Sequence, residues 1–136
     1  MKPFLKTDGG RKSAFPNSDR RAGDCVIRAI TIATGKPYKQ IWKELFSIAL
    51  ETGNFPNADS VCVTYLESEG WERVKFGKKL VRMNSHKIPK DKTIICHTRG
   101  HWVAMMNGIV NDTWDSTTNS MEKSNRVFSY YIKEKV

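Results

Sequence analysis

The sequence lacks several features that would assign it to a large class of proteins. No apolar run approaches the length of a membrane span, and the N-terminus has no apolar segment of the kind found in secretory signals. There is also no internal repeat and no low-complexity segment. We therefore expect a soluble, cytoplasmic protein that does not enter a membrane.

Cysteine is scarce, because the chain has only Cys25, Cys62 and Cys96. An odd number at irregular spacing favours free thiols in a reducing compartment over a disulfide framework. Cys96, His97 and His101 could form a zinc site with one of the other cysteines, but their spacing matches no common zinc pattern. Adjacent residues of one strand also point to opposite faces. We expect neither a metal ion nor another cofactor.

Acidic residues are few compared with basic ones, 14 against 23, and the formal net charge is +9. A positive field attracts nucleic acids and acidic proteins, so either is a possible partner. The chain contains no nucleic-acid recognition motif, which makes a solvated basic surface the simpler interpretation. Its 136 residues correspond to a single domain.

The N-terminal segment, residues 1–22, differs in composition from the rest of the chain. It is rich in Gly, Ser, Asn, Lys and Arg, carries turn signals, and has no periodic apolar pattern. We interpret it as a basic, irregular arm that precedes a domain at residues 23–136.

The first half of that domain has apolar residues at helical spacing. The pattern predicts helices at 25–34, at 37–51 and from residue 59 or 60 to about residue 70. Asp24 has the chemistry of an N-cap, and Gly35 that of a helix terminator. The first helix is nearly all apolar, so we expect it in the centre of the domain.

The second half has short runs of strand-forming residues instead. The predicted strands are 71–76, 93–98, 101–106, 109–115 and 127–132. Asn107-Gly108 is the strongest hairpin signal in the chain. The expected fold class is therefore α+β, with N-terminal helices packed on a C-terminal antiparallel sheet.

Three residue types needed by a thiol enzyme occur in these predicted elements. Cys25 begins the central helix, where unpaired N–H groups and the helix dipole favour the reactive thiolate. His101 begins a strand and could exchange the proton of the thiol. Asp112 and Asp115 in the next strand could orient the histidine. The order Cys, His, Asp predicts a catalytic triad.

The stretches GDCVIRA at 23–29, GHWVA at 100–104 and DTWDS at 112–116 resemble the papain-like cysteine peptidase superfamily. Their compact spacing is most similar to small bacteriocin-leader peptidases and to short phage-encoded proteins of that type. The resemblance implies a papain-like fold, a peptide or protein substrate, and a cytoplasmic location in a bacterial or phage-infected cell. It also implies an amide side chain shortly before the nucleophile that helps to stabilise the oxyanion. Asn17 is the only amide within reach in sequence.

The third member of the triad depends on the register of the hairpin at 107–108. A tight two-residue turn places Asp112 on the face of His101, whereas a three-residue loop places Asp115 opposite His101. Asn-Gly favours the tight turn, but in the family the matching residue stands at the end of its strand, as Asp115 does. We choose Asp115 and keep Asp112 as the alternative.

Two functions follow from these features. The first is a cysteine-dependent hydrolase, a peptidase or amidase, that acts through an acyl-enzyme thioester. The second is a weakly active or inactive papain-like module that binds an acidic protein or a nucleic acid. The four tryptophans, Trp42, Trp71, Trp102 and Trp114, could line a binding cleft, but we expect them to fill the core.

Overall fold

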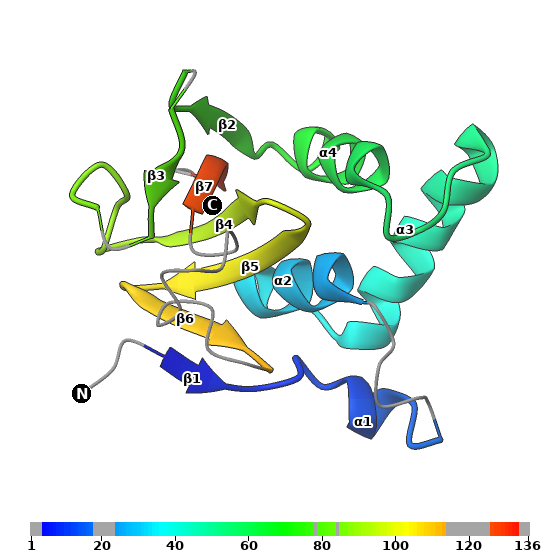
Figure 1. The fold of residues 1–136 in the computed structure, drawn as a ribbon. Coiled ribbons are helices and arrows are strands. Elements are labelled where there is room, and N and C mark those ends of the chain that lie inside the picture. The colour runs from blue at the N-terminus through cyan, green and yellow to red at the C-terminus, as the bar shows by residue number, and fades with distance from the viewer. Residues whose placement is uncertain (1–3, 18–23, 78, 84, 114–125, 134–136) are drawn as a thin grey trace.

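The described residues form an α+β structure with four helices and a mixed seven-stranded sheet (Figure 1). A computed structural model describes residues 4–17, 24–77, 79–83, 85–113 and 126–133. The elements in chain order are β1 (Phe4–Lys6), α1 (Arg11–Ala14), α2 (Cys25–Thr34), α3 (Tyr38–Thr52), α4 (Asp59–Ser68), β2 (Glu72–Lys75), β3 (Val81–Arg82), β4 (Thr93–Thr98), β5 (His101–Met106), β6 (Ile109–Asp112) and β7 (Arg126–Ile132).

The helices begin and end close to the predicted residues, because local signals define their ends. α2 covers the predicted 25–34, and the structure thereby confirms that Cys25 is its first residue. Gly35 and Gly53 terminate α2 and α3 with φ angles of 73° and 74°, in the left-handed region that glycine adopts without strain. Pro37 precedes α3 as its N-cap and fixes the entry of the chain into that helix.

The sheet has the strand order β1-β6-β5-β4-β7-β2, and β3 also pairs with β7. All of these pairs are antiparallel except β1 with β6, which is parallel. The prediction of a purely antiparallel sheet is therefore wrong at one edge. The N-terminal arm is also more regular than predicted, since it contributes both β1 and the short helix α1.

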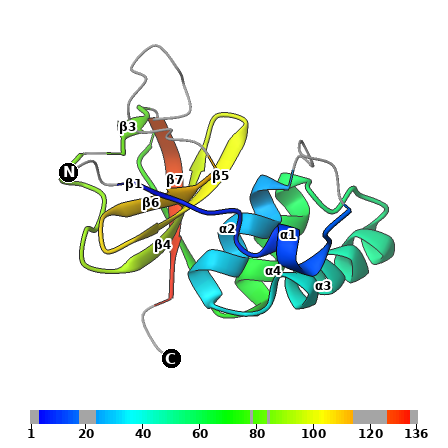
Figure 2. The same ribbon diagram turned by 90° about the horizontal axis from the view of Figure 1, so that it is seen from below.

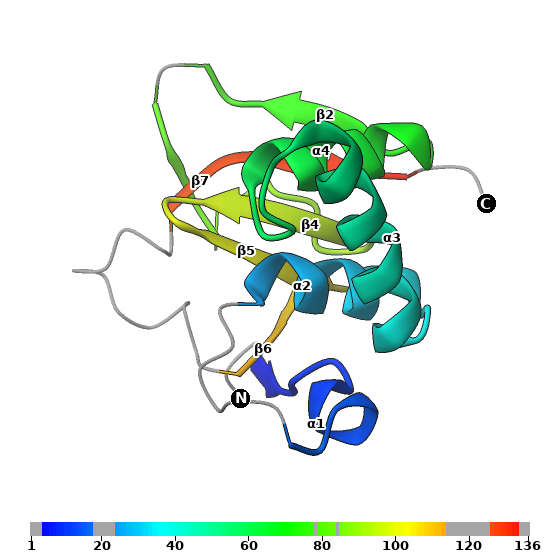
Figure 3. The ribbon, with the colours of Figure 1, turned by 90° about the vertical axis from the view of Figure 1, so that its right-hand side faces the viewer.

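The helices lie on one face of the sheet (Figures 2 and 3). α2 packs against β5 and β4, while α3 packs on α2 and α4 on the side away from the sheet. This interface buries the larger apolar cluster, which includes Ile30, Leu45 and Trp102. The opposite face of the sheet has its own cluster around Met105 and Val110. The predicted central position of the first helix is confirmed.

The β5–β6 hairpin has the tight register. Asn107 and Gly108 both have positive φ angles, 51° and 79°, as the two central residues of a type I′ turn require. Met106 pairs directly with Ile109, and Ala104 pairs with Asn111. The three-residue loop on which the choice of Asp115 depended is absent from this hairpin.

One further property concerns membranes. None of the helices in the described ranges combines the length and the apolar character that a membrane span needs.

Candidate active site

Cys25 occupies a position different from that of the other two cysteines. It is the first residue of α2 and is partly exposed, whereas Cys62 and Cys96 are fully buried in the two apolar clusters. Burial raises the pKa of Cys62 well above its usual value and that of Cys96 to about 12. Near neutral pH both buried thiols stay protonated, so Cys25 is the accessible candidate for a nucleophile.

His101 lies beside Cys25 at the start of β5, directly after the turn that joins β4 to β5. Its Nε2 lies 2.6 Å from Oδ2 of Asp112, and its side chain also forms a hydrogen bond with Cys25. Burial favours the neutral ring, but the hydrogen bonds to Asp112 and Cys25 and their charges outweigh it and raise the pKa of His101 to about 9. The imidazole is therefore protonated near neutral pH.

Asp112 is the carboxylate that contacts His101. One step beyond the Ala104–Asn111 pair, the register brings Asp112 opposite Val103, which shares a face with His101. Burial raises the pKa of Asp112, but the hydrogen bond and charge of His101, the N–H of Thr113 and the charge of Arg28 lower it below its usual value. Asp115 lies outside the described residues. The structure thus brings together Cys25, His101 and Asp112, the residue kept as the alternative third member.

Arg28 connects this site to the start of α2. Its guanidinium donates to Oδ1 of Asp24 and, at 3.2 Å, to Oδ1 of Asp112, and its side chain is only 11% exposed. The second oxygen of Asp24 accepts a hydrogen bond of 2.7 Å from the hydroxyl of Tyr38. Asp24 precedes the helix as predicted, but its side chain makes no N-cap hydrogen bond, because both oxygens are used by Arg28 and Tyr38.

Asn57, which lies between α3 and α4, places its side-chain amide at the N-terminus of α2. Its Oδ1 accepts a hydrogen bond of 3.4 Å from the backbone N–H of Val26, the residue after the nucleophile. Asn17, the amide that the sequence suggested, has an exposed side chain and makes no hydrogen bond with Cys25 in the part of the chain that the structure describes. The structure therefore adds a second candidate for the oxyanion donor.

The residues considered for zinc are engaged in separate contacts. The ring of His97 stacks on Trp102 with a centroid distance of 4.0 Å, and its Nε2 lies 3.4 Å from Oδ2 of Asp59. Cys96 is buried on the other face of the sheet. Within the described residues no group of three or more His, Cys, Asp or Glu side chains could hold a metal ion.

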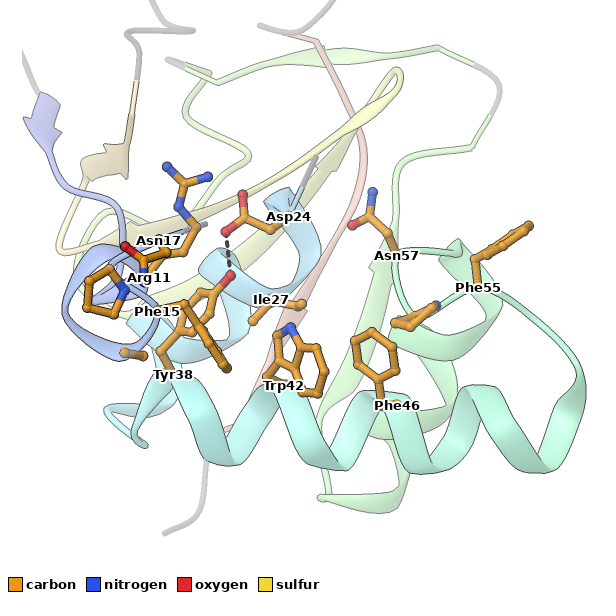
Figure 4. A pocket seen from close by; sticks show the side chains of 13 residues that line it. Arg11, Phe15, Asn17, Asp24, Ile27, Tyr38, Trp42, Phe46, Phe55 and Asn57 are labelled. Carbon is orange, nitrogen blue, oxygen red and sulfur yellow. Dashed lines mark hydrogen bonds between the residues drawn. The ribbon is translucent and has the colours of Figure 1, made fainter. Parts of the chain in front are cut away.

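A pocket of about 600 Å³ opens next to the start of α2 (Figure 4). Trp42 and Phe46 project into it from α3, while Asp24 and Asn57 lie on the side of α2. The expectation that the tryptophans fill the core holds for the buried Trp71 and Trp102, but Trp42 lines the pocket; Trp114 lies outside the described residues.

Three of these residues could not be placed in the site by their sequence context. Arg28 follows Asp24 by one helical turn, and this spacing predicts an ion pair between the two residues. It does not predict the second ion pair, between Arg28 and Asp112. Asn57 and Trp42 carry no local signal, because their role depends on how α2 and α3 pack.

No family model, no curated protein and no solved structure matches this chain. The contacts among Cys25, His101 and Asp112 therefore carry the functional inference.

Proposed function

We propose that the protein is a cysteine-dependent hydrolase, a peptidase or amidase, with Cys25 as nucleophile, His101 as its proton-transfer partner and Asp112 as the group that orients His101. One observation carries the proposal: His101 forms hydrogen bonds with both Cys25 and Asp112 in a nearly buried position. A nucleophile, a base within reach and an orienting acceptor are the parts that covalent thiol catalysis needs.

The raised pKa of His101 keeps on the imidazole the proton that the leaving group requires. Because Nε2 faces Asp112, Nδ1 is the nitrogen left to exchange a proton with Cys25. The thiolate attacks a carbonyl carbon, and His101 donates its proton to the leaving group. The resulting thioester is then hydrolysed, with His101 taking a proton from water. Asp112 holds the ring in place and stabilises its positive charge whenever it is protonated.

The oxyanion requires donors at the start of α2. The backbone N–H of Cys25 is one candidate. The contact of Asn57 with the N–H of Val26 favours Asn57 over Asn17 as the second, because it brings an amide to the helix terminus.

The arrangement of elements is compatible with a papain-like fold, which we propose as the finer description. α2 carries the nucleophile at its N-terminus and packs against β5, and β5 carries the histidine. The third member comes from the neighbouring strand β6.

The test uses p-nitrophenyl acetate, an activated ester that needs no substrate-specific contacts. We expect a burst of p-nitrophenol and the transient appearance of one acetyl group on the peptide that contains Cys25, both measurable by absorbance and mass spectrometry. Cys25→Ala should show neither while keeping the unfolding transition of the natural chain. Acetylation spread over lysines, and equal in Cys25→Ala, would refute the proposal.

A further inference from the structure

The pocket beside Cys25 has a wall of aromatic rings. The rings of Trp42 and Phe46 are stacked with centroids 3.8 Å apart, and Phe15 extends the wall at 5.5 Å from Trp42. Phe55 stands at the rim with 85% of its surface exposed, and Phe46 is 39% exposed. Large aromatic side chains left open to water around a concave surface are typical of ligand sites.

The pocket borders the helix terminus that carries the nucleophile, although Cys25 itself is not among its lining residues. Asp24, the residue before Cys25, lines it, and so does Asn57, whose amide contacts the N–H of the residue after Cys25 (Figure 4). The cavity is thus lined by the residue before Cys25 and by the amide that is hydrogen-bonded to the residue after it. A group attached to Cys25 as a thioester would start from this border of the pocket.

Among the described residues that line the pocket, no carboxylate is left unpaired. The two oxygens of Asp24 are engaged by Arg28 and by Tyr38. The negative charge of Asp24 is therefore balanced by Arg28. An apolar group that displaces water from the pocket does not leave this carboxylate without a partner. The volume of about 600 Å³ accommodates a large side chain.

We propose that this pocket binds a bulky apolar side chain, preferably an aromatic one, in the acyl part of the substrate. The inference rests on the proposed function, since it assigns the group that becomes attached to Cys25. Offset stacking and burial against Trp42 and Phe46 would select such a side chain over a small one. The substrate class is thus a peptide or amide with an aromatic or large aliphatic residue on the acyl side of the bond that is cleaved.

The test compares two chloromethyl ketones, those of N-acetyl-phenylalanine and N-acetyl-alanine. In each the thiolate forms a bond to the methylene carbon and chloride leaves. The rate of Cys25 modification is followed by mass spectrometry and divided by the rate with free N-acetylcysteine. We expect the phenylalanine probe to react about tenfold faster or more after this correction.

Matched variants locate the origin of the preference. Phe55→Ser and Leu50→Ser each remove an exposed apolar side chain, 85% and 86% exposed, but only Phe55 lines the pocket. Phe55→Ser and Phe46→Ala should reduce the preference several-fold, whereas Leu50→Ser should leave it unchanged. Iodoacetamide, which has no side chain, should modify Cys25 equally in all three.

The outcomes separate the two proposals. If iodoacetamide modifies Cys25 no faster than a buried thiol, the proposed function fails and this inference fails with it. If iodoacetamide selects Cys25 but both ketones react equally, only the pocket assignment is wrong. Equal rates together with a change from dimer to monomer in Phe55→Ser would instead identify the aromatic wall as a contact with a second copy of the chain.

Discussion

The two sides of the N-terminus of α2 differ in chemistry and in exposure. On the side of the sheet, Arg28, Asp112 and His101 are nearly buried and joined by charge-assisted hydrogen bonds. On the side of α3, Phe46 and Phe55 are exposed to solvent, and the ring of Phe46 stacks on that of Trp42. Cys25 lies between the two regions.

This difference separates the two tasks that the proposed function requires. Proton transfer depends on fixed geometry, which a buried, hydrogen-bonded network provides. Recognition of a side chain needs an accessible apolar surface, which necessarily leaves aromatic groups exposed before the substrate binds. Substitutions on the polar side should therefore affect stability and chemistry, and those on the aromatic side should affect the choice of substrate.

The largest stability effect is expected at Arg28. Arg28→Leu removes the cation shared by Asp24 and Asp112 and leaves two buried carboxylates without it, so the free energy of unfolding should fall by about 3 kcal/mol or more. Urea denaturation measures this loss. Arg82→Leu, at an exposed strand position, is the control and should change stability by no more than about 0.5 kcal/mol. If both substitutions lowered the free energy of unfolding by the same small amount, the ion pairs of Arg28 would not stabilise the polar side of the site.

A smaller effect is expected from pH. The pKa of His101 rises from 6.5 to about 9 on folding, so the folded state holds this proton more tightly than the unfolded state. The stabilisation is complete below pH 6.5 and is lost as the pH rises through about 9, with a size on the order of 1 to 3 kcal/mol.

The matched variant for this measurement is His101→Gln, which keeps a hydrogen-bond donor for Asp112 but does not titrate. Its free energy of unfolding should fall less than that of the natural chain over the same pH range. If both fall in parallel, the proton on His101 contributes nothing and the interaction with Asp112 is not ionic.

Local patterns in the sequence were sufficient for much of the scaffold. The helical period together with Gly35 and Gly53 places α2 and α3 to within a residue or two, because these signals act within one or two turns. β1 could not be predicted, since three residues are too short for a periodic pattern and its partner β6 lies near the other end of the chain.

The candidate site was predictable in its first two members. Cys25 and His101 stand at the ends of elements whose boundaries have local signals. The choice of the third member depended on a one-residue shift. The turn chemistry of Asn107-Gly108 predicted the observed register, which brings Asp112 to His101, while Asp115 lies outside the described residues. Arg28 and the aromatic pocket arise only from tertiary packing.

The central claim is that His101, oriented by Asp112, activates Cys25. Its most direct test is the rate at which iodoacetamide modifies Cys25 near neutral pH in four proteins: the natural chain, His101→Ala, Asp112→Ala and Asp115→Ala. We predict a decrease of about 100-fold or more for His101→Ala, an intermediate decrease for Asp112→Ala, and the natural rate for Asp115→Ala. A normal rate in Asp112→Ala together with a slow one in Asp115→Ala would contradict the account and return the orienting role to Asp115.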